Sequence, residues 1–439
     1  MIVLLLGTHL FLTVRLRFPQ RKIFTAIKLS FKHDKQSDGD VSQFAALATS
    51  LAATIGTGNI IGVATAISLG GPGAVLWCWL TGLFGIATKY SEGLLAIKYR
   101  VSTAQGRMIG GPMYALERGL GMKWLAIVFS LFTAIAAFGI GNTVQANAIT
   151  INVAQYTDGV MSDTVSHIVS GAVLAILVGA VIIGGVKSIA RVCTAFVPLM
   201  ALLYVAGCLY VLSVNYQYII PAISLIVNEA FSLKATAGGT AGTVLMMAAR
   251  YGIARGLFSN ESGMGSAPIV AAAAQTKNPV RQALVSSTGT FWDTVVICAL
   301  TGLVIVTSII GNPSIDITDG ALLTKKAFDA IPYVGTPILS FGILTFAFST
   351  ILGWSYYGER AMEYLLGHRS VPFYRILWVA LVFLGSIMSL DLVWNIADIM
   401  NALMAIPNLL SLLLLSPVLA EQTTYYLWND HLSEEDKSI

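Results

Sequence analysis

Two polar, glycine-rich stretches interrupt long apolar segments: TIGTGN (54–59) lies within 43–68, and SNESGMGS (259–266) lies within 243–275. Each stretch puts small and polar residues where a helix in contact with lipid would carry Leu, Ile or Val. Irregular backbone at membrane depth is tolerated only where it lines a cavity or is buried in protein. The pattern therefore predicts two broken membrane helices that expose backbone groups to a ligand. Close helix packing through small residues is the alternative, but it does not account for the clustered Thr, Asn, Glu and Ser.

The composition also indicates a membrane protein. Only 11% of the 439 residues are charged, 56% are hydrophobic, and the mean hydropathy is +0.76. Soluble domains have about 25% charged residues, so a soluble or disordered chain is excluded. The net charge of +4 is too small to indicate a nucleic-acid partner. The chain is expected to be an all-α polytopic protein whose surroundings are the lipid bilayer.

The hydropathy pattern predicts about eleven transmembrane helices. The apolar run 1–14 is shorter than a full span and is interpreted as an extra N-terminal helix, tilted or truncated. The amphipathic basic segment 20–32 predicts an interfacial helix on the cytoplasmic leaflet. Ten further spans are predicted at 43–68, 72–98, 124–151, 165–187, 192–214, 243–275, 281–311, 335–366, 373–389 and 392–420. Short loop helices are expected at 218–233 and 319–331, and a cytoplasmic tail at 421–439.

The Lys and Arg residues orient these spans. With the segment after the first run placed in the cytoplasm, they divide 21 to 5 in favour of the cytoplasmic side. The bias predicts a cytoplasmic C-terminus and a location in the plasma membrane, the inner membrane in bacteria.

The two breaks occupy equivalent positions. Asn59 and Asn260 are about 200 residues apart, and each break lies in the first span of a group of five, 43–214 and 243–420. Because five is odd, the second group enters the membrane with the opposite orientation. This five-plus-five arrangement is typical of inverted-repeat secondary transporters, which bind their ligands near the midplane.

Other classes of function find little support. The sequence has no HExxH, GxSxG or paired-aspartate motif, and its five histidines lie away from the breaks, which argues against an enzyme. No repeated filter loop is visible, which argues against a channel.

At the breaks the sequence resembles the alanine or glycine:cation symporter family. The matching stretches are SLAATIGTGNIIGVATAISLGGPGAVLWCWLTGLFGIATKYSE (50–92), IGGPMYALERGLG (109–121), GNTVQANAI (141–149), RYGIARGLFSNESGMGSAP (250–268) and STILGWSYYGERA (349–361). The resemblance implies the leucine-transporter type fold with one extra N-terminal helix and broken core helices 1 and 6. It implies import of alanine or glycine with Na⁺, or with H⁺ in some members. No protein partner is implied.

The breaks predict the substrate site. Backbone N–H groups around Thr57, Gly58 and Asn59 are the expected carboxylate ligands, and a simple helix kink is the alternative. Gln145 is a polar residue in mid-span, so we expect it to face the site or to bond another helix. The predicted partners of the substrate amino group and the aromatics that close over its side chain are Phe258, Ser259, Asn260, Gly263 and Trp354.

The family's fold also implies one Na⁺ site, because a hard cation prefers oxygen ligands. Carbonyls of Ala52, Ile55 and Phe346 would join the hydroxyls of Ser349 and Thr350. Bonding of these hydroxyls to their own helix is the alternative.

The charged residues inside the spans complete the list of candidates. Asp293 is expected either to couple a cation or to pair with a hydroxyl. Glu261 could cap a half-helix, and Glu92 is predicted to pair with Lys89. Two arginines before the second break, Arg250 and Arg255, would form an outer gate or attract the substrate carboxylate.

Overall fold

The computed structural model describes residues 2–32, 38–104, 106–233, 242–329, 333–388 and 390–436. Within these ranges, only the backbone is described for Ala321 and for residues 390–398. Residues 437–439 of the predicted tail therefore lie outside the described part of the chain.

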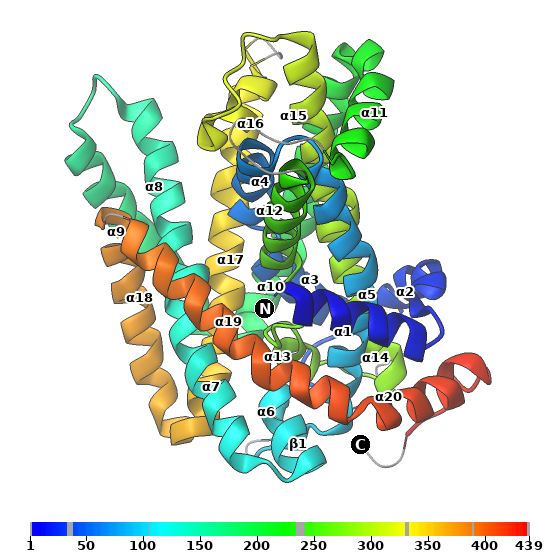
Figure 1. Ribbon diagram of the computed structural model, residues 1–439. Helices are drawn as coiled ribbons and strands as arrows, with labels where there is room; N and C mark the ends of the chain where they lie inside the picture. Colours follow the sequence, from blue (N-terminus) through cyan, green and yellow to red (C-terminus); the bar gives the residue numbers. More distant parts are fainter. Residues whose placement is uncertain are drawn as a thin grey trace.

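The described chain is almost entirely helical, as predicted (Figure 1). Its first half contains α1 (Ile2–Arg15), α2 (Ile23–Ser30), α3 (Gln43–Thr54), α4 (Val63–Gly70), α5 (Ala74–Lys98), α6 (Pro112–Tyr114), α7 (Lys123–Phe138), α8 (Val144–Thr157), α9 (Asp163–Ile182), α10 (Gly185–Val214) and α11 (Ile219–Ala230). Its second half contains α12 (Thr243–Asn260), α13 (Pro268–Ala271), α14 (Pro279–Thr290), α15 (Ala299–Gly311), α16 (Gly320–Phe328), α17 (Gly335–Leu366), α18 (Val371–Ile387), α19 (Leu390–Leu414) and α20 (Ser416–Thr423). A small antiparallel hairpin pairs β1 (Val101–Ser102) with β2 (Met108–Ile109).

Most predicted spans appear as single long helices. Within the described residues, six helical segments are long and apolar enough to cross a membrane, or nine if each of three bent pairs counts as one span. The other two predicted spans correspond to α5, which buries Lys89 and Glu92, and to α12, which stops at the second break. The first break bends α3 against the helix that follows by 53°.

Five segments of the described chain widen into π-helical turns. Three of them lie on helices around the breaks: Gly58–Gly62 after α3, Gly139–Thr143 between α7 and α8, and Phe291–Cys298 between α14 and α15. Such turns are frequent at functional sites because they rotate the side chains that follow them.

The C-terminal helix differs from the prediction, which ended the last span at 420. The chain bends by 58° near Leu415, and α20 continues through a π-turn to Trp428. Pro417 is the second residue of α20, where a missing N–H costs nothing, so the helix restarts instead of ending. The indole of Trp428 then donates a hydrogen bond of 3.2 Å to the Leu16 carbonyl, which ties this segment to the end of α1.

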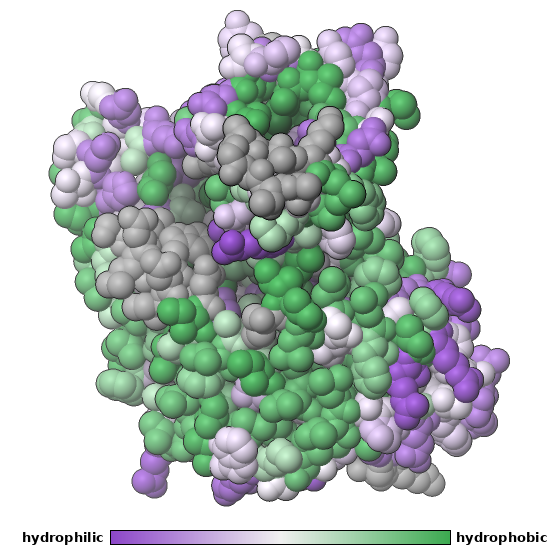
Figure 2. Space-filling view, viewed as in Figure 1, coloured by the Kyte–Doolittle hydropathy of each residue, from purple (hydrophilic) through white to green (hydrophobic). Residues whose placement is uncertain are grey.

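The surface is largely apolar around the middle of the bundle and polar toward its ends (Figure 2). Large apolar side chains remain exposed on outward-facing helices, such as Ile176 on α9, Leu202 on α10 and Ile376 on α18, as expected of a lipid-facing surface. One end of the bundle carries α11 and α16, and the opposite end carries β1 and α20 (Figure 1). We call them the α16 end and the β1 end.

Candidate transport site

The first break is held open by Asn59. After α3 ends at Thr54, the Asn59 Oδ1 atom accepts a hydrogen bond of 2.9 Å from the Gly56 N–H. The Asn59 Nδ2 group donates to the Asp293 Oδ1 atom at 2.7 Å and to the Asp293 carbonyl at 3.1 Å. One buried amide therefore caps the unwound turn and connects it to the π-turn in the second half of the chain.

The second break follows Asn260 and uses left-handed backbone. Glu261, Gly263 and Gly265 have φ angles of 54°, 90° and 84°. Glycine adopts this region without steric cost, whereas Glu261 is held there by its surroundings. The Asn260 Oδ1 atom accepts a hydrogen bond of 2.9 Å from the Ser262 N–H, so an asparagine caps this break as well.

Glu92 on α5 anchors the second break. Its Oε1 atom accepts hydrogen bonds of 3.0 Å from the N–H groups of both Gly263 and Gly265, and one of 2.7 Å from Asn408 Nδ2. Asn408 also donates to the Gly263 carbonyl at 2.9 Å. The predicted Glu92–Lys89 ion pair is thus wrong: Glu92 is buried and satisfies backbone groups that the membrane interior leaves without water.

Asp293 lies where the two breaks meet. Besides Asn59, its carboxylate accepts hydrogen bonds from Ser259 at 2.9 Å and from Thr294 at 2.6 Å. The side chain is completely buried. Pairing with hydroxyl groups, one of the two expected roles, is observed: Ser259 belongs to the second break, and Thr294 to the same π-turn as Asp293.

A small cavity of about 10 Å³ lies between the breaks, roughly the space that one water molecule needs. Its wall is formed by Ala53, Thr54, Gly56, Gly58, Ile140, Gln145, Phe258, Glu261, Thr350 and Trp354. Gln145 donates from Nε2 to the Ile140 carbonyl at 3.0 Å, and its buried Oε1 atom has no hydrogen-bond partner in the described chain. That oxygen is available to a donor placed in the cavity.

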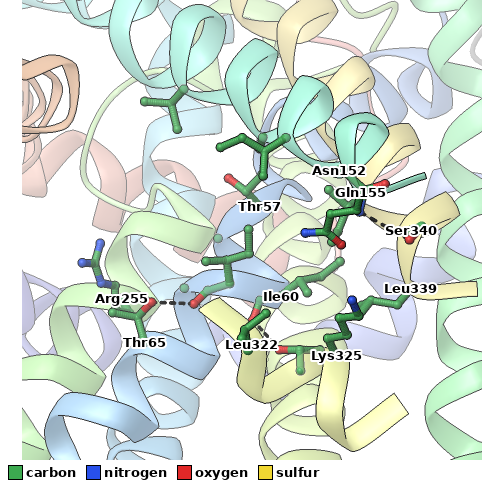
Figure 3. A pocket seen from close by; sticks show the side chains of 18 of the residues that line it. Thr57, Ile60, Thr65, Asn152, Gln155, Arg255, Leu322, Lys325, Leu339 and Ser340 are labelled. Atoms are coloured by element: carbon green, nitrogen blue, oxygen red, sulfur yellow. Dashed lines mark hydrogen bonds between the residues drawn. The ribbon is translucent and has the colours of Figure 1, made fainter. Parts of the chain in front are cut away.

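A second cavity of about 640 Å³ lies between the first break, α8, α12, α16 and α17, toward the α16 end (Figure 3). Gly58 and Phe258 line both cavities, so the Phe258 ring lies between the large space and the small one. A Cβ atom at Gly58 would lie 3.1 Å from that ring, which shows how closely backbone and aromatic pack. Arg255 also lines the large cavity, with its guanidinium 6.0 Å from the centre of the Phe258 ring.

The five oxygen atoms predicted to bind a cation come together beside the small cavity. Thr350 Oγ1 lies 3.1 Å from the Ala52 carbonyl oxygen and 3.4 Å from that of Ile55. Ser349 Oγ lies 3.3 Å from the Ala52 oxygen. Both hydroxyls also bond the Phe346 carbonyl of their own helix at 2.9 Å, the alternative considered from the sequence. The arrangement offers a set of oxygen ligands typical of a hard cation site.

Trp354 closes the small cavity on the α17 side. Its indole N–H donates a hydrogen bond of 2.9 Å to Glu261 Oε1. The Trp354 side chain also packs against the π-turn between α7 and α8. A Cβ atom at Gly141 would lie 2.2 Å from the Trp354 Cβ, so only glycine fits there.

The comparisons with known proteins agree with this architecture. The model of the sodium:alanine symporter family matches residues 1–438. The chain belongs to this family.

Two relatives and one solved structure are similar to the symporter over most of its length. A sodium/alanine symporter, AgcS of Methanococcus maripaludis, is 52% identical and covers 96% of this chain and 93% of its own. An uncharacterized transporter of Haemophilus influenzae is 50% identical, covering 100% and 95%. The crystal structure of MhsT in complex with L-phenylalanine has a TM-score of 0.63 at 14% identity, covering 90% of this chain and 95% of that one. The predicted leucine-transporter type fold is thereby confirmed, and the symporter is a sodium-coupled amino-acid transporter rather than an enzyme.

Some predicted site residues of the symporter do not line the small cavity. Gly263 uses both of its backbone polar groups on Glu92 and Asn408, away from the cavity wall. Arg250 is exposed beside the Tyr251 ring, and among the described residues neither it nor Arg255 makes an ion pair. The salt-bridge form of the outer gate is therefore not observed.

Glu261 accepts hydrogen bonds from Trp354 and Ser266 instead of capping a helix. Glu92 satisfies the backbone N–H groups of this break.

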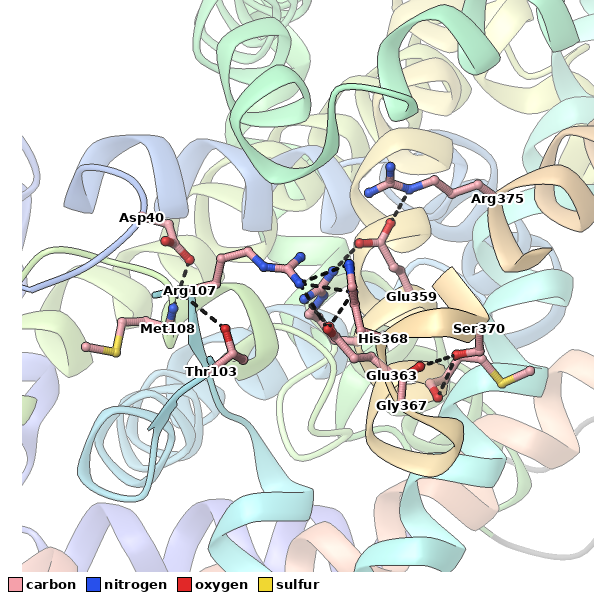
Figure 4. A network of polar contacts seen from close by, with 12 residues as sticks. Asp40, Thr103, Arg107, Met108, Glu359, Glu363, Gly367, His368, Ser370 and Arg375 are labelled. Atoms are coloured by element: carbon pink, nitrogen blue, oxygen red, sulfur yellow. Dashed lines mark hydrogen bonds and ion pairs between the residues drawn. The ribbon is translucent and has the colours of Figure 1, made fainter. Parts of the chain in front are cut away.

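An ion network holds the β1 end of the symporter together (Figure 4). Arg107, in the β1–β2 hairpin, contacts Glu363 of α17 at 3.2 Å, and Arg375 of α18 contacts Glu359 at 2.6 Å. Arg360 pairs with both glutamates. Asp40, just before α3, accepts from the Met108 N–H at 3.1 Å, and burial raises the pKa of its carboxyl group. The hairpin, α3, α17 and α18 are thus linked below the site.

Replacing Glu92 tests the anchor of the second break. Glu92→Ala removes the acceptor of three hydrogen bonds, each worth about 1.5–3 kcal/mol when one partner is charged. We expect uptake by reconstituted protein to fall about tenfold or more. Glu92→Gln, which keeps an acceptor oxygen, should lie between this variant and the unmodified chain.

Glu435→Ala is the matched control for Glu92, because the Glu435 side chain is exposed, so its removal takes no buried acceptor away. If Glu92→Ala and this control show equal uptake, Glu92 does not anchor the second break.

Gly141→Ala tests the contact between Gly141 and Trp354. The added methyl would push Trp354 from its position against Glu261, so we expect loss of most alanine binding, measured by calorimetry on purified protein. Gly62→Ala is the control, because a Cβ atom there meets nothing within 4 Å. Equal affinities in the two variants would show that Trp354 does not shape the site.

Proposed function

We propose that the symporter imports alanine or glycine together with Na⁺ by alternating access. The observation that carries this proposal is a small cavity between two unwound helices, next to a convergent set of oxygen atoms. A zwitterion needs N–H donors for its carboxylate and acceptors for its ammonium group, and broken helices supply both.

Of the proposed substrate contacts, Gly58, Gln145 and Phe258 line the small cavity, whereas Thr57, Asn59, Ser259 and Asn260 belong to the two breaks without lining it. Backbone N–H groups around Thr57, Gly58 and Asn59 would bind the carboxylate. The Gln145 Oε1 atom, which lacks a partner in the described chain, and carbonyls near Phe258, Ser259 and Asn260 would accept from the ammonium group. Phe258 and Trp354 line a cavity with room for only about one water molecule, so the cavity would have to widen for any amino acid, and least for one whose side chain is a hydrogen atom or a methyl group.

The proposed Na⁺ ligands are the carbonyl oxygens of Ala52, Ile55 and Phe346 and the hydroxyls of Ser349 and Thr350. An ion there would bridge α17 and the end of α3, and so order the first break before the substrate binds. Coupling requires that Na⁺ and amino acid both favour the same closed state.

The orientation is part of the same proposal. The β1 end would face the cytoplasm together with the C-terminus, in agreement with the excess of Lys and Arg, and the membrane would be the plasma membrane. The large cavity would then be the external vestibule, where Arg255 can attract the substrate carboxylate. The ion network of Arg107, Arg360 and Arg375 would close the cytoplasmic exit.

Proton coupling is a second candidate. It is favoured by two buried carboxyl groups close to the breaks. Asp293 and Glu261 each contact a break residue and could carry a proton in place of an ion.

Uptake into liposomes separates these functions. We expect labelled alanine and glycine to accumulate with an inward Na⁺ gradient, and neither to accumulate when K⁺ replaces Na⁺. Accumulation driven by a proton gradient without Na⁺ would select the second candidate. Uptake that ignores both gradients would refute both.

Thr350→Val tests the cation ligands at nearly constant volume. Loss of one oxygen ligand should raise the Na⁺ concentration for half-maximal uptake about tenfold, equivalent to about 1.4 kcal/mol. Thr345→Val on the same helix is the control, since the Thr345 hydroxyl bonds only its own helix and should leave the value within about twofold. Identical Na⁺ dependence in both variants would contradict the proposed ligands.

A further inference from the structure

A long apolar groove runs along the outside of the bundle, between α2, α3, α10 and the π-turn at 291–298. Its volume is about 370 Å³. The floor is buried and apolar, as at Leu47 and Ala48, whereas Phe31 and Leu202 on the rim are 68% and 67% exposed. The groove therefore opens toward the surrounding lipid, separate from the transport site.

The groove has the length of one lipid leaflet. Along α3 its lining extends from Phe44, at the start of the helix, to Ile55, where the helix has just ended. Eleven residues of helix rise about 16 Å, and half of a hydrocarbon core is about 15 Å. An acyl chain that starts at the membrane surface would thus end at the first break.

The lining of the groove contains two polar side-chain groups, the Ser30 hydroxyl and the Trp292 indole N–H. Ser30, in its lining, donates to the Ala26 carbonyl at 3.0 Å and is satisfied within α2. Phe31 and Phe44 stack at its mouth, with ring centres 5.5 Å apart, at the level where aromatic residues border the membrane interface. An apolar chain fits this lining better than water or a polar ligand does.

The mouth of the groove is positively charged. Lys28 and Lys32 are exposed on the same segment as Ile27 and Phe31, and neither forms an ion pair within the described ranges. Hydrophilic side chains gather around α2 at the right of Figure 2. We propose that this groove binds an anionic phospholipid, with one acyl chain along α3 and the headgroup on Lys28 and Lys32.

The groove lies directly behind the first break. Leu51 and Ile55 belong to its lining, and the Ile55 carbonyl faces Thr350 on the other side of the chain. A bound lipid would therefore support the helix that carries the proposed Na⁺ ligands. This consequence rests on the proposed function, whereas lipid binding itself does not.

Lipid binding to the purified full chain tests the proposal by native mass spectrometry, with phosphatidylglycerol and phosphatidylcholine as probes. Each basic residue near an anionic headgroup contributes about fivefold in affinity, so we expect a preference for phosphatidylglycerol of about tenfold or more. The double variant Lys28→Gln, Lys32→Gln should lose this preference. Lys123→Gln should keep it, because α7, which begins at Lys123, contributes no residue to the groove lining, whereas Lys28 and Lys32 each directly follow a lining residue, Ile27 and Phe31.

Ala201→Phe provides an independent variant, because it fills the groove without changing charge. We expect it to weaken binding of both lipids about fivefold. Equal affinity of the unmodified chain for the two lipids, or an unchanged preference in the double lysine variant, would overturn the proposal. If inorganic phosphate alone competes for the groove as strongly as the lipid does, the acyl chain does not contribute to binding, and that part of the proposal is overturned.

Discussion

Two stretches of non-helical backbone inside a membrane must find hydrogen-bond partners within the protein, and the rest of the structure depends on this requirement. Asn59 and Asn260 each cap the break in which they occur. Glu92 and Asn408 reach the second break from other helices. Polar side chains of distant helices therefore converge on the breaks, and an atom that is left without a partner there, such as Gln145 Oε1, is available to a ligand.

Features that depend on local sequence were predicted well. Composition and hydropathy gave the helical membrane class, and the span 335–366 coincides with α17. The glycine clusters located both breaks because Thr, Asn, Glu and Ser accompany them, which close packing through small residues does not require. The end of the last helix was missed because Pro417 was compatible with a restart of the helix after a bend.

Features that depend on distant contacts were not predictable from one sequence. Glu92 and Lys89 are neighbours on one helix turn, which suggested an ion pair, but Glu92 is held by groups 171 to 316 positions away. Likewise, Gly141 is small because Trp354 occupies the space beside it. The cation ligands were placed by family resemblance, and the structure brings their oxygen atoms together.

In the proposed mechanism, the two unwound segments form one site that Na⁺ and amino acid complete together. Hydrogen–deuterium exchange measures it directly, because backbone N–H groups in both segments lack regular helical partners. We predict that exchange in 54–62 and in 259–266 slows together when Na⁺ and alanine are both present, and much less with either alone. Slowing confined to one segment, or equal slowing with K⁺ in place of Na⁺, would contradict the account.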